Sequence, residues 1–298
     1  MRAKMACGIV DSQHWIGAMV LTMLLAGCAQ NSANPTETVD VTARAAANLA
    51  RDVQQIQNLM SRRAFYHSAG RNDLEFELYS KKQPDISWAQ NQGFQIGPAS
   101  IKKYYVDQHA ANEVTDLARM TKLYPELKND ASHLNAGSFV IHTLTTPIIE
   151  VAGDGQTAKG VWYTVGAIGM TDAKGKLGGN WLWERYGVDF IKEDGQWHFW
   201  HIMVLTDFMS GMGKDLAPPP AMASAAPVGT ESKAAAKSGS GAAGGGAGGG
   251  AGPGASPWDI QVGNYKSWAP TVSQQVLPRL PEPYKTFSET FSYGPPPK

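Results

Sequence analysis

The chain has 298 residues, among them 32 Gly and 18 Pro, and its 26 Lys and Arg side chains balance 26 Asp and Glu side chains. A formal net charge of zero without a basic stripe argues against nucleic acid as the main partner. Because the Gly and Pro residues gather after residue 217, we expect one packed domain and not two.

The first 27 residues resemble a bacterial lipoprotein signal. An apolar run over 15–25 follows two basic residues and ends in Leu-Ala-Gly-Cys at Cys28, and it is too short to span a bilayer comfortably. By this resemblance Cys28 becomes the lipidated first residue of a protein held in the outer membrane and facing the periplasm, with residues 28–40 as a tether. Cleavage would remove Cys7 and exclude an internal disulfide. An uncleaved anchor or a buried helix is the alternative.

A long helical pattern begins at Val41. Apolar side chains recur from Leu49 onward at three- and four-residue spacing, which is typical of a helix with one buried stripe. His67 lies eighteen positions after Leu49 and so returns to the same stripe. We therefore expect the His67 side chain to point inward.

Shorter elements follow this helix. The pattern predicts a second helix over 73–80, a strand over 85–91, and a third helix that Gly97 opens and that carries Tyr104 and Tyr105. Helices and a short strand ahead of a long run of strands give an α+β order.

Residues 137–208 are predicted to form four consecutive antiparallel strands, because runs rich in Val, Ile, Thr, Tyr and Trp are closed by Gly or Asp-Gly. Asp194 and Gly195 suit a two-residue type I′ turn, which fixes a register. The facing pairs in this register are Lys192–Trp197, Phe190–Phe199, Val188–His201 and Tyr186–Met203. One face is then apolar, with His201 set into it beside Glu184, whereas Arg185 and Asp189 lie on the other face.

The composition changes again after residue 213. Residues 214–256 are rich in Ala, Gly and Pro and are expected to be a disordered linker. Residues 257–298 carry aromatic side chains among prolines without a helical period, which indicates an extended C-terminal strap. The aromatic residues of this strap are Trp258, Tyr265, Trp268, Tyr284, Phe287, Phe291 and Tyr293. We expect them to pack on a folded domain, either of the same chain or of a neighbour.

Four stretches carry a resemblance to a known family. They are YHSAGRNDLEFELYSKKQPDISW (66–88), GPASIKKYY (97–105), IHTLTTPIIEVAGDGQTAKGVW (141–162) and DFIKEDGQWHFWHI (189–202). In this order they resemble the SnoaL-like branch of the nuclear transport factor 2 superfamily, which includes scytalone dehydratase, a hexachlorocyclohexane dehydrochlorinase and γ-formaldehyde lyases. The resemblance implies that residues 41–213 form a cone-shaped α+β barrel, a curved antiparallel sheet wrapped on the long N-terminal helix with a pocket at its open end.

The resemblance also implies a general base. In the dehydratase-like members a strand histidine abstracts a proton and an aspartate near the end of the first helix orients it. His142 matches the histidine by its place in the strand, but the aspartate has no match. Gly70 or Arg71 stands near its position, and His67 does so only if an insertion of two residues is allowed. An imidazole titrates near neutrality and suits this task, although His142 could instead be a hydrogen-bonded core residue.

Further site candidates follow from their places in the pattern. Tyr66, His67, Glu184 and His201 are candidates for assisting His142, and Trp88, Tyr104, Tyr105, Trp162, Tyr186 and Met203 are candidates for lining the pocket. Glu184 could also be a solvated strand end, and the aromatic side chains could be core. Their number favours an aromatic or polycyclic ligand. We expect no metal, because His198 and His201 point to opposite faces of a strand, and no nucleotide cofactor, because no phosphate-binding glycine motif is present.

Three functions remain open at this point. The first is a cofactor-independent lyase or isomerase that acts on a hydrophobic small molecule. The second is a non-catalytic lipoprotein that binds such a molecule, and the third is a structural envelope lipoprotein. Each is compatible with a membrane anchor and with a homo-oligomer. A polar pair inside the cone would favour the enzyme, whereas a wholly apolar cone would favour binding.

Overall fold

The computed structural model describes residues 35–128, 130–212, 256, 258–263, 265, 267, 272–273 and 275–297. The predicted signal with Cys28, residues 28–34 of the tether, residues 214–255 of the linker and Trp268 of the strap lie outside this described part. The chain divides into two compact units, residues 1–43 and 44–298. No helix within the described ranges is long and apolar enough to cross a membrane.

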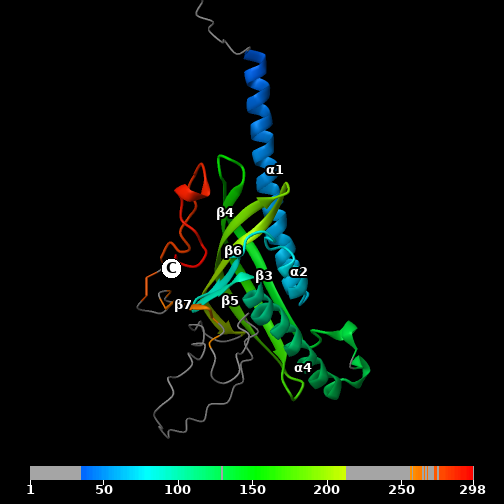
Figure 1. Cartoon of the computed structure of the whole chain (residues 1–298). Coiled ribbons are helices and arrows are strands. Elements are labelled where there is room, and N and C mark those ends of the chain that lie inside the picture. The colour runs from blue at the N-terminus through cyan, green and yellow to red at the C-terminus, as the bar shows by residue number, and fades with distance from the viewer. Residues whose placement is uncertain are drawn as a thin grey trace, which may run out of the picture. The chain divides into compact units, whose positions relative to one another are not determined.

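Along the chain a first group of helices and a short strand pair are followed by further helices and then by the long strands (Figure 1). The helices are α1 (Pro35–Ser68), α2 (Asn72–Phe76), α3 (Gly97–Ile101), the π-helical η1 (Lys102–Asp107) and α4 (Gln108–Leu123), with 3-10 turns η2 (Pro125–Leu127), η3 (Ala131–His133) and η4 (Phe287–Glu289). The strands are β1 (Ser87–Gln90), β2 (Gly93–Ile96), β3 (Ser138–Val151), β4 (Thr157–Thr171), β5 (Leu177–Glu193), β6 (Gln196–Gly211) and β7 (Ile260–Gln261).

The helix boundaries differ from those expected. Helix α1 begins at Pro35 and not at Val41, since proline suits the first turn of a helix. Leu49 is 50% exposed, so the buried stripe of α1 starts later than the pattern indicated. Helix α2 ends at Phe76 instead of residue 80. Strand β1 lies within the strand expected over 85–91, and it forms a hairpin with β2, which the sequence pattern did not predict.

The strands form one seven-stranded sheet in the order β3-β4-β5-β6-β1-β2-β7. Strands β3 to β6 are four consecutive antiparallel strands, as predicted. Strand β1 comes from the helical half of the chain and pairs with β6 in parallel, which makes the sheet mixed. The sheet is curved and open, with β3 and β7 at its edges (Figure 1), and the later part of α1, from Ile56 onward, packs against it. The predicted α+β fold, a curved sheet on a long N-terminal helix, is confirmed.

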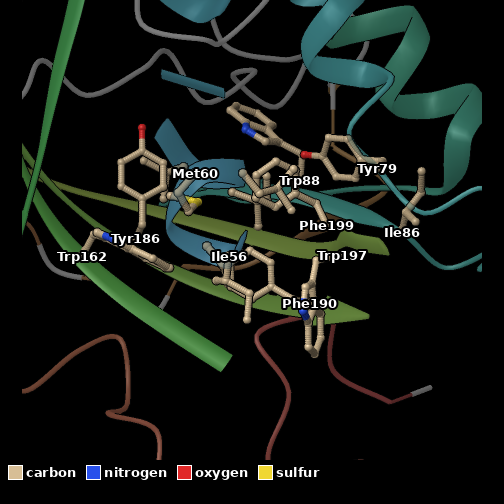
Figure 2. Close-up of a cluster of buried hydrophobic side chains, with 14 of the residues drawn as sticks. Ile56, Met60, Tyr79, Ile86, Trp88, Trp162, Tyr186, Phe190, Trp197 and Phe199 are labelled. Atoms are coloured by element: carbon tan, nitrogen blue, oxygen red, sulfur yellow. The ribbon is translucent and has the colours of Figure 1, made fainter. Parts of the chain in front are cut away.

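The core lies between α1 and the concave face of the sheet. Ile56 and Met60, one helical turn apart on α1, are at most 1% exposed and pack toward Tyr186 and Phe190 of β5 (Figure 2). Burying such a side chain contributes about 1.5–3 kcal/mol. Because His67 lies seven residues after Met60, close to two full helical turns, it is held on this same inward face.

The turn at Asp194 and Gly195 sets part of the predicted register. Lys192 faces Trp197 and Phe190 faces Phe199, as expected. The register then shifts between Asp189 and Phe190, so that His201 faces Asp189 and Trp200 is left as the extra residue of a bulge. The predicted pairs of Val188 with His201 and of Tyr186 with Met203 are therefore wrong by one residue.

A slip of one residue moves a strand side chain to the other face of the sheet. Nδ1 of His201 lies 2.9 Å from Oδ2 of Asp189, on the convex face. Met203 faces Gly187 and alternates with the core residues Ile202 and Val204, so it also points away from the core. The prediction that His201 and Met203 belong to the pocket face is wrong for this reason.

The convex face is covered by the strap of the same chain. Asp189 is fully buried and is the centre of the contact. Its Oδ1 lies 2.5 Å from Nζ of Lys159, and its Oδ2 accepts hydrogen bonds from the Ser292 hydroxyl at 2.7 Å and the Tyr293 backbone N–H at 2.8 Å. The strap therefore docks on its own chain, one of the two arrangements that the sequence left open.

Aromatic rings of the strap surround the Lys159 ammonium. Nζ of Lys159 lies 4.3 Å from the ring centre of Phe287, 4.6 Å from that of Phe291 and 5.3 Å from that of Tyr293. Burial lowers the pKa of Lys159, and the ion pair with Asp189 opposes this effect. A cation placed among ring faces is attracted to their negative potential, which suits it to a site without water.

Candidate active site

Two histidines from distant parts of the chain meet on the concave face. His67 stands in the last turn of α1, and His142 on β3 faces Gly166, a residue without a side chain, on β4. Their ring centres are 4.9 Å apart and the ring planes are inclined by 50°. Both side chains are less than 10% exposed. The predicted proximity of the two histidines is confirmed, while their catalytic roles stay predictions.

His142 is backed by a carboxylate from the sheet. Nδ1 of His142 lies 3.3 Å from Oε2 of Glu184, and the hydroxyl of Thr206 donates a hydrogen bond of 2.9 Å to Oε1. Burial alone would raise the pKa of Glu184, but the contact with His142 and the bond from Thr206 bring the pKa below its ordinary value. Glu184 is thus a buried, partnered carboxylate and not a solvated strand end.

His67 is backed by a second carboxylate, Glu75 of α2. Nδ1 of His67 lies 3.3 Å from Oε2 of Glu75 and 3.1 Å from the hydroxyl of Tyr105. Tyr105 donates a hydrogen bond of 2.5 Å to the same carboxylate oxygen. Arg63 lies 3.5 Å from the other oxygen and donates to the Tyr105 hydroxyl at 3.2 Å. Four side chains from three helices therefore form one connected polar group.

The two carboxylates determine which ring nitrogens can act. Burial alone would raise the pKa of Glu75, but Arg63 and His67 bring it below its ordinary value, so Glu75 is an anion that accepts. An imidazole nitrogen that contacts such an oxygen is the one that carries the proton. Nδ1–H of His67 and Nδ1–H of His142 are assigned on this ground, and Nε2 of each ring is left to exchange protons.

Burial also sets the charge of His67. It lowers the pKa of His67, and His142 and Arg63 lower it further, although Glu75 acts in the opposite direction. At neutral pH the His67 imidazole is therefore uncharged and can accept a proton.

Several buried polar atoms around the two histidines have no hydrogen-bond partner among the described residues. They are Nδ1 of His142, Oε2 of Glu184, Oε1 of Glu75, Oγ1 of Thr164, Nε1 of Trp88 and Nδ1 of His109. The 3.3 Å contact of His142 with Glu184 is thus close but poorly aligned. An unpaired buried polar group costs about 1–3 kcal/mol. A polar group of a bound molecule would recover part of this free energy.

Other predicted site residues are distributed unevenly around this cluster. The Tyr186 hydroxyl accepts a bond of 3.5 Å from Arg63, and the Trp88 ring lies 5.1 Å from that of Tyr105. Trp162 packs edge-on against Phe190 and belongs to the core. Tyr66 and Tyr104 are half-buried, and within the described part of the chain neither hydrogen-bonds to the histidines or their carboxylates.

Sequence reasoning missed Arg63, Glu75 and Thr206. Arg63 lies four residues before His67 on the same inward face, so its helical phase was a usable signal. Glu75 follows a tight turn after α1, and no periodic pattern places its side chain. Thr206 faces Glu184 only because of a second register shift, between Trp183 and Glu184.

A surface depression of about 330 Å³ lies elsewhere, between α1 and the β5–β6 turn. Asn58, Arg62 and Trp197 are among its lining residues, and none of the predicted site residues lines it. Within the described ranges, no three His, Cys, Asp or Glu side chains are grouped so as to hold a metal ion.

Comparison with known proteins finds solved structures that resemble part of this chain. A hexachlorocyclohexane dehydrochlorinase from Novosphingobium barchaimii is 14% identical, covering 58% of this chain and 99% of its own, with a TM-score of 0.38. A candidate scytalone dehydratase from Novosphingobium aromaticivorans is 13% identical, covering 60% of this chain and 99% of its own, with a TM-score of 0.41. An NTF2-like protein with a cystatin-like fold from the same species is 17% identical, covering 59% of this chain and 91% of its own, with a TM-score of 0.37. No curated protein sequence matches.

The model of the SnoaL-like domain matches residues 48–202, which is just over half of the chain. The matched range runs from α1 to the middle of β6 and so contains both histidines and both carboxylates. The chain therefore belongs to the SnoaL-like domain family.

Proposed function

We propose that the chain is a cofactor-independent lyase or isomerase in which one of the paired histidines removes a proton from a hydrophobic, aromatic or polycyclic small molecule. One observation carries this proposal. Two imidazole rings 4.9 Å apart, each backed by its own buried carboxylate, face each other in a water-poor cluster. Membership of the SnoaL-like family supports it.

The arrangement has the parts that acid–base catalysis needs. Nε2 of an imidazole accepts a proton, and the carboxylate behind Nδ1 holds the ring and stabilises the imidazolium that forms. A positioned general base contributes roughly 10²–10⁴-fold to a rate. The rings of Trp88 and Tyr105 beside the cluster suit an aromatic substrate. The unpaired polar atoms supply donors and acceptors that would orient its polar group.

The test uses a small activated aromatic compound that reacts by proton removal alone. Purified full-length protein is mixed with nitrobenzisoxazole, and release of the coloured phenolate is followed. We expect turnover above that of free imidazole at equal concentration, and its loss in a variant that combines His67→Gln with His142→Gln. The variant His133→Gln, altered in the 3-10 turn η3, is the matched control. A wild-type rate no higher than that of free imidazole would overturn the proposal.

A second measurement separates catalysis from binding. Native mass spectrometry of the wild-type protein and of the double-histidine variant detects any small molecule that stays bound through purification. An enzyme is expected to release a product that differs in structure from the compound trapped by the inactive variant. The same unchanged compound in both would favour a binding protein.

A further inference from the structure

We propose that the two histidines have opposite roles at rest: His142 is an imidazolium held by Glu184 and gives a proton, whereas neutral His67 accepts one. This rests on the proposed function and deepens it. It also reverses the role that the family resemblance implies for His142. The charges that surround the pair carry the inference.

The buried charges do not balance unless one histidine is protonated. Arg63 is positive, and Glu75 and Glu184 are negative, so the group carries one net negative charge when both imidazoles are neutral. The other titratable side chains that face it are Tyr79, Tyr105 of η1, His109 of α4 and Tyr186 of β5. Burial raises the pKa of all three tyrosines and lowers that of His109, so these four are uncharged. One proton on an imidazole makes the group neutral.

The positions of the buried cations place that proton on His142. Glu75 already has Arg63 at 3.5 Å. Glu184 has no lysine or arginine partner in the described part of the chain, and His142 is the basic group in contact with it. A buried carboxylate without a counterion is costly, so the imidazolium is placed where it removes most of that cost.

A second proton on the pair is disfavoured. Two imidazolium rings with centres 4.9 Å apart would repel each other in a site that excludes water. Arg63 lies close to His67 and adds to the repulsion on that ring. The pair therefore stores one proton, with the accepting ring and the donating ring side by side.

This division of roles balances for an elimination. Nε2 of His67 takes the proton from a substrate carbon, and the C–H electron pair becomes the new C=C bond. The bond to the leaving oxygen breaks with its electron pair, and that oxygen takes the proton of His142, so water or an alcohol departs. His67 is then the imidazolium and His142 is neutral, and proton transfer between the adjacent rings restores the resting state. Such a pair suits a leaving group that must gain a proton, on the same face as the C–H bond.

Nuclear magnetic resonance of ¹⁵N-histidine-labelled full-length protein at neutral pH reads the location of this proton. The long-range ¹H–¹⁵N pattern distinguishes an imidazolium from each neutral tautomer, and His67→Gln and His142→Gln assign the two rings. We expect the imidazolium pattern for His142 and the neutral Nδ1–H pattern for His67. Two neutral rings, or an imidazolium at His67, would overturn the inference. If a glutamine variant does not fold, the corresponding asparagine variant provides the assignment.

Replacing the carboxylate tests the cause. Glu184→Gln is expected to convert His142 to a neutral ring, whereas Glu77→Gln, on an exposed side chain, should change neither pattern. An imidazolium that persists in Glu184→Gln would contradict the charge argument. These spectra do not depend on turnover, so failure of the nitrobenzisoxazole assay with the expected spectra would count against the proposed function and not against the proton's location.

Discussion

Docking of the strap depends on one glycine in the middle of β5. Gly187 faces the strap, and a Cβ placed on it would lie 2.6 Å from Cδ1 of Tyr293 and 2.9 Å from Cβ of Pro278. Carbon atoms pack best at about 3.5–4.0 Å, so Gly187→Ala requires the Tyr293 ring to retreat by roughly 1 Å. Tyr293 is only 2% exposed, and its backbone N–H is bonded to Asp189, which fixes the position of this residue.

The cost of this substitution can be bounded in two ways. If the strap stays docked, overpacking costs about 1–3 kcal/mol. If Tyr293 leaves its site, the lost burial costs about 1.5–3 kcal/mol. Both routes lower the free energy of unfolding by a similar amount, which corresponds to a decrease in Tm of roughly 2–12 °C for a chain of this size. Thermal unfolding followed by circular dichroism measures the shift, and limited proteolysis reports whether the strap has become cleavable.

The matched control is Gly178→Ala in the same strand, where a Cβ would meet nothing closer than the Met170 carbonyl oxygen at 3.9 Å. We expect this variant to keep the wild-type Tm within the effect of an ordinary surface substitution. Equal Tm values for Gly187→Ala and Gly178→Ala would refute the close packing of strap on sheet.

Three further predictions concern the strap and the anchor. Asp189→Asn leaves the Lys159 ammonium buried without a counterion and should cost about 3–5 kcal/mol in urea unfolding; a loss below about 1 kcal/mol would contradict the network. Burial alone would lower the pKa of His201, but the hydrogen bond to Asp189 and the nearby charge of Asp85 raise it above its ordinary value. The stabilisation from His201 is therefore complete below about pH 6.5 and is lost as the pH rises through the raised pKa. Tm of the wild type should therefore fall as the pH rises above about 6.5, and His201→Gln should remove this dependence of Tm on pH. An equal dependence of Tm on pH in both proteins would show that His201 is not responsible. We also propose that Cys28 is lipidated, so that Cys28→Ser moves the protein from the membrane fraction to the soluble fraction, and a variant that stays membrane-bound at full length would exclude a lipid anchor.

The sequence by itself determined the elements whose signal is local and periodic. The 3.6-residue stripe of α1 places His67 inward, and the Asp194-Gly195 turn pairs Phe190 with Phe199. Runs rich in Val, Ile, Thr, Tyr and Trp that end in Gly or Asp-Gly predict β3 to β6, and the aromatic residues of the strap indicate a segment that packs on a folded domain. Family resemblance added His142. These features depend on neighbours within a few residues, so a pattern can reveal them.

The tertiary structure decided the features that depend on residues far apart in the chain. The bulge at Trp200 moves His201 to the convex face. A bulge inserts one extra residue into a strand, and a periodic sequence pattern does not predict where that happens. The carboxylates that back the histidines come from α2 and β5, where the resemblance implied an aspartate on the first helix. Only the packed structure shows that residue 187 must lack a side chain because the Tyr293 ring lies against it. Each of these contacts joins segments separated by many residues, and their geometry is set by how the curved sheet closes on α1 and the strap, which local propensity does not encode.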